Sequence, residues 1–271
     1  MRRRMTSTPG RAVTSLVVAA VALAFAAPAD AASLTHSQRH VADALISLFE
    51  NDTPVIQYCY IEDIHDGRGY TAGRAGFTTA TSDLLEVVER YTKDFGDNPL
   101  APFLPRLREV NGSDDTAGLE GLPDAWKQAC ADRRFRDEQD AVVDDEYFKP
   151  ALRRARSVGL KLPLSIAQLY DAEIQMGGGD DPDGTPALIK ETTKRAHGTP
   201  RARKVSEKTW LKTFLKVRRK HLTHAADPAT REAWRDSVYR VEVFEYLVKK
   251  GQWKLKPPLR IKTPQYDLTL R

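Results

Sequence analysis

Apolar residues recur at helical spacing along most of the chain. Residues 35–38 read Thr-His-Ser-Gln, which fits a capping box, and the apolar positions within 41–49 form one face of a helix that Pro54 stops. The same spacing predicts further helices at 100–110, 125–131, 137–148, 151–158, 163–176 and 186–196. Two amphipathic helices containing Trp210 and Trp234 follow. The pattern predicts a mainly helical protein.

One region departs from this pattern. A second helix is expected from Val55 to about Ile64. The glycine-rich stretch 66–73 and the β-favouring residues 77–79 then predict a small hairpin or short sheet. Ser82 is expected to cap the helix that comes next. After the last helix, Pro257-Pro258 begins an extended tail.

The first 31 residues have the features of a secretory signal. A basic start precedes an apolar stretch at 12–27, and the small residues 28–33 include an A-x-A cleavage site. The apolar stretch is short for a bilayer span, so an uncleaved anchor is the less favoured alternative. We expect removal of residues 1–31, which leaves 32–271 as a secreted, extracellular catalytic domain without membrane association.

Charge disfavours a nucleic-acid partner. The whole chain carries +5, but the expected signal contains four arginines and one aspartate, so the mature protein is near +2. A nucleic-acid-binding domain is usually more basic. The acidic run at 137–146 is interpreted as a solvated helix face, with an acidic groove for a polycation as the alternative. We expect a monomer.

The cysteine and histidine content limits other chemistry. Cys59 and Cys130 can pair in an oxidising compartment, although sequence alone does not give their separation. No Cys/His spacing indicates zinc, and His65 has no second histidine at a useful interval. We expect no metal and no cofactor.

Candidate catalytic groups lie around residues 58–71, which hold three carboxylates within five residues before a tight turn. Glycosidic cleavage needs one protonated carboxyl group and one ionised one. Glu50 lies at a helix C-terminus, where the helix dipole favours the protonated form. Asp66 is followed by Arg68, which favours a carboxylate, and Thr71 can hold the attacking water. Solvated surface acids are the alternative interpretation.

The segment Tyr60-Ile61-Glu62-Asp63-Ile64, followed by Asp66-Gly67-Arg68-Gly69-Tyr70-Thr71, closely resembles the signature of the family-46 glycoside hydrolases, which are bacterial secreted chitosanases. Further matches are at 76–77, 83–86, 91–92, 110–112, 147–151, 170–172 and 257–259. The resemblance implies a mainly α, two-lobed, lysozyme-like fold. A small antiparallel β-sheet would lie in the minor lobe, which includes about residues 60–110, and a substrate cleft would separate the lobes.

The resemblance also implies endo-hydrolysis of the β-1,4 linkages of chitosan with inversion and without a metal. It assigns Glu50 as general acid, Asp66 as general base and Thr71 as the residue that positions water. The implied contacts to chitosan and its oligosaccharides are Tyr60, Asp63, Arg68 and Asp83. A buried ionic network that supports the acid corresponds to Asp171, Arg218 and Arg240.

Some alternatives remain open from sequence alone. Asp52 is a second candidate for the acid because the loop after Glu50 is short, and Arg231 and Arg235 lie close enough to Arg240 to take its place in the network. A lysozyme-like peptidoglycan hydrolase and a non-catalytic polysaccharide-binding protein are the competing functions. N-acetylated sugars carry no amine charge, so acidic side chains facing the sugar nitrogens favour a chitosanase.

Overall fold

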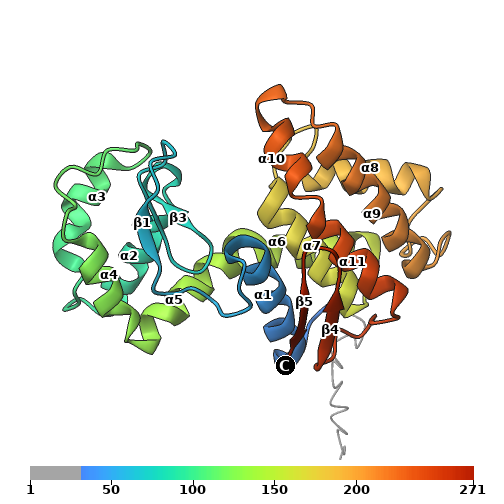
Figure 1. Ribbon diagram of the computed structural model, residues 1–271, viewed down its shortest axis with the longest axis horizontal. Helices are drawn as coiled ribbons and strands as arrows, with labels where there is room; N and C mark the ends of the chain where they lie inside the picture. Colours follow the sequence, from blue (N-terminus) through green and yellow to red (C-terminus); the bar gives the residue numbers. More distant parts are fainter. Residues whose placement is uncertain (1–31) are drawn as a thin grey trace, which may run out of the picture. The chain divides into compact units, whose positions relative to one another are not determined.

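A computed structural model describes residues 32–271 (Figure 1), so the predicted signal peptide lies outside the described residues. The described residues belong to one compact unit. Within this range, no helix combines the length and the apolar character needed to cross a membrane.

The described elements are mostly helices. The longer helices are α1 (His36–Asn51), α2 (Asp83–Asp94), α3 (Leu104–Val110), α4 (Leu122–Cys130), α5 (Arg133–Val143), α6 (Lys149–Val158), α7 (Pro163–Met176), α8 (Thr185–Arg195), α9 (Glu207–Thr223), α10 (Arg231–Asp236) and α11 (Tyr239–Lys249). The shorter helical segments are η1 (Thr79–Thr81), η2 (Ala101–Phe103), η3 (Asp144–Phe148) and η4 (Pro228–Thr230). The strands are β1 (Ile61–Asp63), β2 (Tyr70–Ala72), β3 (Phe77–Thr78), β4 (Leu259–Lys262) and β5 (Asp267–Leu270). The mainly helical prediction is confirmed.

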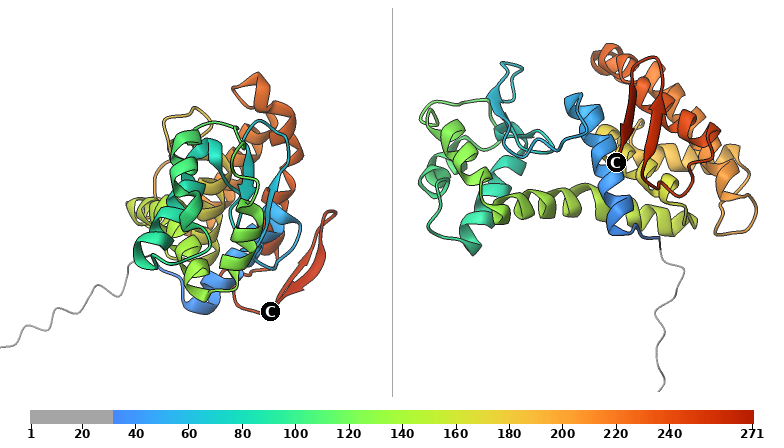
Figure 2. Two further views of the ribbon diagram at one scale, coloured as in Figure 1. Left: turned by 90° about the vertical axis from the view of Figure 1, so that its left-hand side faces the viewer. Right: turned by 60° about the horizontal axis from the view of Figure 1, so that its bottom comes forward.

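These elements form two packed groups (Figure 1). In the first, α2 packs against α3 and α5, and α4 packs against β1. In the second, α7 contacts α6 and α8, and α9 contacts α8 and α11. The π-helical segment η3 joins α5 to α6 end to end, so one nearly continuous helical run connects the groups (Figure 2). Helix α1 packs on α7.

The N-terminus of α1 follows the sequence prediction. The Thr35 hydroxyl accepts from the Gln38 backbone N–H (3.3 Å), and Gln38 Oε1 accepts from the Thr35 N–H (2.9 Å), which completes the capping box. The predicted apolar face is buried, with Leu45 and Leu48 each 1% exposed. The helix ends at Asn51, and the C-cap residue Asp52 adopts a left-handed conformation with φ 52°. Burial of this face fixes the position of α1 against the core, and with it the position of Glu50 in the last turn of the helix.

The predicted helix from Val55 to Ile64 is wrong. Residues 61–63 form β1, which pairs antiparallel with β2 in the register Ile61↔Ala72, and β2 pairs with β3. Pairing buries Ile61 to 6% exposure while Glu62 points outward. Cross-strand packing outweighs the weak local preference for helix in this short segment. The predicted short sheet is confirmed, with a third strand that the sequence pattern did not indicate.

The C-terminal region also differs from the prediction. The single helix expected around Trp234 and Val248 is divided into α10 and α11 by a turn at Ser237. The tail expected to be extended forms a hairpin of β4 and β5 with the register Leu259↔Leu270. Strand β4 packs against α11. This packing buries the alternating side chains Leu259 and Ile261, which are both 0% exposed. The hairpin brings residues 265 and 266 toward the end of α1.

Cys59 and Cys130 form a disulfide with a Cα–Cα separation of 5.3 Å, inside the range that a disulfide requires. It ties the segment before β1 to the end of α4. The double substitution Cys59→Ser/Cys130→Ser is expected to lower the free energy of unfolding by about 4 kcal/mol, because the bond closes a loop of 71 residues. Urea unfolding of the oxidised, reduced and double-serine proteins measures this. Equal stability of all three would contradict it.

Candidate active site

Two tyrosines hold the C-terminal end of α1. The last carbonyls of a helix lack intrahelical partners and need other donors. Here the Tyr266 hydroxyl donates to the Leu48 carbonyl (3.1 Å), and the Tyr239 hydroxyl donates to the Phe49 carbonyl (2.9 Å). Both donors come from the C-terminal part of the chain. They fix the backbone immediately before Glu50, whose side chain is 32% exposed.

A buried chain of charges leads from Glu50 into the core. Arg240 Nη1 donates to Glu50 Oε1 (2.6 Å), and Arg240 Nη2 donates to Asp171 Oδ1 (2.6 Å). Arg218 Nη1 donates to the other oxygen, Asp171 Oδ2 (2.5 Å), and Arg218 also bonds Gln175. Asp171 and Arg218 are both 0% exposed. The structure thus brings together the predicted network residues Asp171, Arg218 and Arg240, and Arg240 is the residue that contacts the candidate acid.

Electrostatics within this network are dominated by the arginines. Burial alone would raise the pKa of Asp171, but Arg218 and Arg240 together hold that pKa below its ordinary value. Asp171 is therefore ionised, and its single negative charge offsets part of the positive charge of Arg218 and Arg240. Glu50 is the second carboxyl group that Arg240 contacts. Of the two alternatives to Arg240, Arg231 instead donates to the carbonyl of Ala225 (2.8 Å).

The turn between β1 and β2 forms the second half of the site. Asp66 Oδ2 accepts from Arg68 Nη2 (2.6 Å) and Nε (2.8 Å), and Oδ1 accepts from the Arg68 backbone N–H (3.1 Å). The hydrogen bonds from Arg68 lower the pKa of Asp66, whose side chain is 30% exposed. Gly69 has φ +68°, and a Cβ there would collide with the Thr79 hydroxyl, so the turn needs glycine.

Thr71 has an unusual environment. Thr71 is 8% exposed, and its hydroxyl oxygen is buried without a hydrogen-bond partner among the described residues. An unpaired buried hydroxyl costs free energy unless a water or ligand bonds to it. Thr71 lies on the central strand β2, opposite Glu62 and Thr78. The hydroxyl therefore lacks a partner within the described residues, at a position that lines the cleft described below.

The end of α1 and the segment around β1 and β2 both contribute residues to a cleft of about 670 Å³. Four predicted site residues line it, namely Glu50, Tyr60, Arg68 and Thr71. Residues that the sequence did not single out as cleft residues also line it, among them Gln57, Tyr239, Gln265 and Tyr266. Asp52 lines the cleft as well, so position alone does not separate it from Glu50 as the acid. The ion pair with Arg240 belongs to Glu50.

The other predicted site residues, Asp63, Asp66 and Asp83, are not among the residues that line this cleft. Asp66 forms an ion pair with Arg68, and Arg68 lines the cleft. Asp63 is 24% exposed and accepts from the His65 N–H (2.9 Å). Tyr60 donates to Glu62 (3.1 Å). None of these contacts tests the predicted substrate roles.

Asp83 has a structural role that the sequence did not indicate. Its Oδ1 accepts from the backbone N–H groups of Thr78 (2.8 Å) and Leu84 (2.9 Å) and from the Thr81 hydroxyl (2.7 Å). Burial raises the pKa of this carboxyl group despite these donors. Ser82 has φ 69° and makes no side-chain cap, so the predicted Ser82 cap is wrong because Asp83 binds the nearby donors instead. The substrate role of Asp83 stays a prediction.

The acidic run at 137–146 is largely paired. Asp140 bonds Arg74 and accepts from the Tyr58 hydroxyl (2.8 Å), Asp144 pairs with an arginine of α1, and Asp145 pairs with Arg90 (2.8 Å). These three carboxylates bind arginines of other elements, whereas Asp137 is 60% exposed and Glu146 is exposed, so the solvated-face interpretation fits only part of the run. Among residues 32–271, no group of three or more His, Cys, Asp or Glu side chains lies together as a metal ion would require.

Comparison with known proteins agrees with this geometry. Residues 44–259 match the model of glycosyl hydrolase family 46. The chain is 48% identical over 238 residues to a chitosanase of Bacillus subtilis (strain 168), an alignment that covers 87% of this chain and 86% of that protein.

Solved structures give the same result. The crystal structure of native chitosanase from Bacillus subtilis MY002 has a TM-score of 0.79 and 46% identity, covering 88% of this chain and 100% of that chain. A family-46 chitosanase of Gynuella sunshinyii in complex with chitotetraose has a TM-score of 0.77 and 48% identity, covering 88% and 99%. The predicted lysozyme-like fold is confirmed. The fold and cleft are those of a glycoside hydrolase. The chain belongs to glycosyl hydrolase family 46.

Loss of one tyrosine hydroxyl is expected to loosen the end of α1. Tyr239→Phe should lower the free energy of unfolding by about 1 kcal/mol, because the Phe49 carbonyl loses its donor. Urea unfolding measures the change, and Tyr246→Phe on the same helix is the matched control. Equal effects of the two substitutions would show that the hydroxyl does not support this helix end.

Proposed function

We propose that this protein is a secreted endo-chitosanase that hydrolyses the β-1,4 linkages of chitosan with inversion at the anomeric carbon. The observation that carries the proposal is the cleft lined by Glu50 and by Thr71, whose buried hydroxyl is unpaired, next to the Asp66–Arg68 ion pair. The relatives named above are chitosanases, and one of them is a complex with chitotetraose. Together these favour glucosamine polymers as the substrate.

Glu50 and Asp66 are assigned complementary proton transfers. Glu50 protonates the glycosidic oxygen as the bond to the leaving sugar breaks. Asp66, kept ionised by Arg68, removes a proton from the attacking water, and the Thr71 hydroxyl orients that water. The two carboxyl groups come from different elements, the end of α1 and the turn before β2. Such an arrangement suits inversion, which needs space for a water between them.

Arg240 positions the acid in this mechanism. Its guanidinium is 5% exposed and bonds Asp171 as well as Glu50, so it cannot swing away without leaving Asp171 with Arg218 alone and its Oδ1 without a donor. The Tyr239 and Tyr266 hydroxyls hold the backbone at the same place. Rigid placement of the acid lowers the barrier, because proton donation depends on distance and direction.

Substrate recognition is proposed to rest on charge. The amines of chitosan are protonated, and a carboxylate gives an ammonium group a charge-assisted partner. Asp63 is partly exposed near the cleft, and Tyr60 and Arg68 line it. The assignment of Asp83 to the same role rests on the family resemblance. Secretion rests on the signal-like residues 1–31, and the active form is proposed to be a monomer.

The test is release of reducing ends from soluble chitosan, chitin and peptidoglycan in parallel. Activity on chitosan alone is expected, and proton NMR at early times should show the α-anomer first. Preferential cleavage of peptidoglycan would instead favour a lysozyme-like enzyme. A protein that binds chitosan but cleaves none of the three would be a binding protein.

A further inference from the structure

The positive charge of the described residues is concentrated in one segment. Residues 185–224 contain twelve Lys and Arg and two Glu, a net charge of +10. Residues 32–271 together carry about +2, so the rest of this range carries about −8. The segment consists mainly of α8 and α9, which pack against each other. Arg218 is buried in the ionic network, but the other eleven cations leave this segment strongly basic at the surface despite the near-neutral total, and the field of such a surface reaches beyond single contacts.

A cavity of about 820 Å³ lies at this surface and is larger than the catalytic cleft. Five exposed cationic side chains line it from the two helices, namely Lys190, Lys194, Arg195, Lys216 and Lys220. Its one acidic residue is Glu191. Glu50 and Thr71, which carry the proposed hydrolysis together with Asp66, line a separate cleft.

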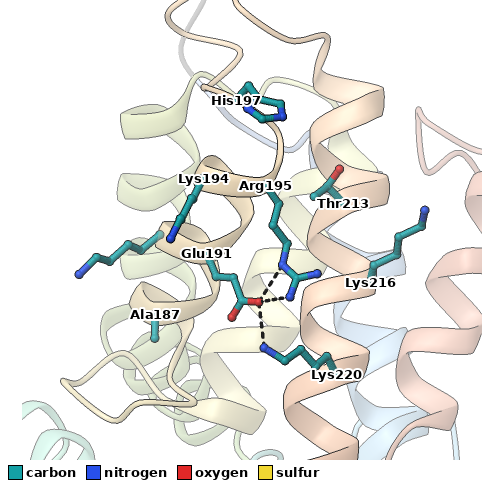
Figure 3. Close-up of a pocket in the computed structure, with 9 residues that line it drawn as sticks. Ala187, Glu191, Lys194, Arg195, His197, Thr213, Lys216 and Lys220 are labelled. Carbon is teal, nitrogen blue, oxygen red and sulfur yellow. Dashed lines mark hydrogen bonds and ion pairs between the residues drawn. The ribbon is translucent and has the colours of Figure 1, made fainter.

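Glu191 arranges the cations around itself. Its Oε1 bonds Arg195 Nη2 (2.6 Å) and Lys220 Nζ (3.1 Å), and its Oε2 lies 2.7 Å from His221 Nε2. His221 first, and then Lys220 and Arg195, lower the pKa of Glu191 to about 2. Figure 3 shows Arg195 and Lys220 reaching this carboxylate from α8 and α9. Glu191 therefore holds the charged ends of the Arg195 and Lys220 side chains in place, and the net charge of the residues that line the cavity remains positive.

The other lysines are free to bind a ligand. Among the ion pairs of the described residues, none involves Lys190, Lys194 or Lys216. Lys216 also lines an adjoining cavity of about 440 Å³ together with Lys212 and Lys249, so the basic surface continues beyond the first cavity. Lysines four residues apart on a helix are separated by about 6 Å along its axis. This repeat suits a linear ligand with regularly spaced negative charges.

We propose that the α8–α9 cavity binds a linear phosphodiester polymer, a polyol-phosphate or sugar-phosphate chain, through the five cations named above. Chitosan is excluded because its ammonium groups are repelled. A polymer of carboxylates is less favoured than one of phosphates. Planar carboxylates are matched best by the guanidinium group of arginine, but four of these five cations are lysines, which bind phosphate as point charges.

Two other anionic partners fit this site less well. The described residues that line the cavity include no Phe, Tyr or Trp, so the bases of a nucleic acid would find only the smaller His197 ring and the Arg195 guanidinium to stack on. The large exposed apolar side chains of the described residues, Val55 and Ile64, do not line it, and a membrane surface would gain no apolar anchor there. A phosphate chain without bases or lipid tails matches the lining.

Binding of fluorescent poly(glycerol phosphate) to the purified protein tests this proposal. The logarithm of the binding constant should fall with the logarithm of salt concentration with a slope of about −3, from roughly four net charges. The triple variant Lys190→Gln/Lys194→Gln/Lys216→Gln should flatten that slope by about 2 and weaken binding about tenfold or more at low salt. The matched control removes three exposed lysines elsewhere, Lys93→Gln/Lys127→Gln/Lys256→Gln, and should bind like the wild type.

The remaining outcomes overturn the proposal. These are no binding by the wild type at low salt, equal weakening in both triple variants, or tighter binding of polygalacturonate, oligothymidylate or anionic vesicles. Hydrolysis of soluble chitosan should be the same in both triple variants and the wild type. That assay separates failure of this inference from failure of the proposed catalytic function.

Discussion

Replacing Asp66 with asparagine is expected to lower kcat on chitosan by about 10²–10⁴-fold, because it removes the proposed general base. Binding of chito-oligosaccharides should remain measurable, since Asp66 contacts Arg68 and does not itself line the cleft. Steady-state kinetics and a binding titration measure the two effects. The matched control is Asp52→Asn, which removes a carboxylate that lines the cleft and should cost less than about tenfold.

The same assignment predicts a pH dependence. The base must be ionised, so kcat/KM falls as the pH drops through the pKa of Asp66, which Arg68 holds below its usual value. Arg68→Met should therefore move the acidic limb of the profile to higher pH. An Asp66→Asn enzyme that retained more than about a tenth of wild-type kcat, or an acidic limb unmoved in Arg68→Met, would contradict the role of Asp66 as base.

Replacing Asp171 with asparagine is expected to lower the free energy of unfolding by about 3–5 kcal/mol, because Arg218 and Arg240 would lose their shared buried carboxylate. Activity should fall as well, since Arg240 also holds Glu50. Urea unfolding and chitosan hydrolysis measure both. The exposed Asp97→Asn is the control for stability.

Acid sensitivity gives an independent test of Asp171. Its folded-state pKa is depressed, so its contribution to stability is full above the unfolded-state pKa of about 3.9 and is lost as the pH falls through the folded value. The Asn variant should lack this part of the stability loss below about pH 4. An unchanged melting temperature, or an unchanged acid limb of stability, would show that the network does not stabilise the fold.

Local signals in the sequence predicted local structure well. The capping box at Thr35 and the apolar face of α1 concern residues within a few turns of each other, and the structure has both. The helix expected from Val55 failed because its alternative, pairing of β1 with β2, depends on residues about ten positions away. The split between α10 and α11 and the β4–β5 hairpin depend on tertiary packing in the same way.

The site shows the same distinction at longer range. Glu50 and Arg240 are 190 residues apart, and helical periodicity gives no means of pairing them, so this contact came from the family resemblance. Tyr239 and Tyr266 were missed because their hydroxyls bind backbone carbonyls, which leave no sequence signal. The basic α8–α9 surface was missed because charge was averaged over the whole chain.

The most direct test of the central claim, that Glu50 is the acid and Asp66 the base, compares two substrates. One is a chito-oligosaccharide, and the other is its dinitrophenyl glycoside, whose leaving group needs no proton. Glu50→Gln should be nearly inactive on the first and recover most of the wild-type rate on the second, whereas Asp66→Asn should stay inactive on both. The account would be contradicted if Glu50→Gln hydrolysed the natural oligosaccharide at the wild-type rate, or if only Asp52→Asn were rescued by the activated substrate.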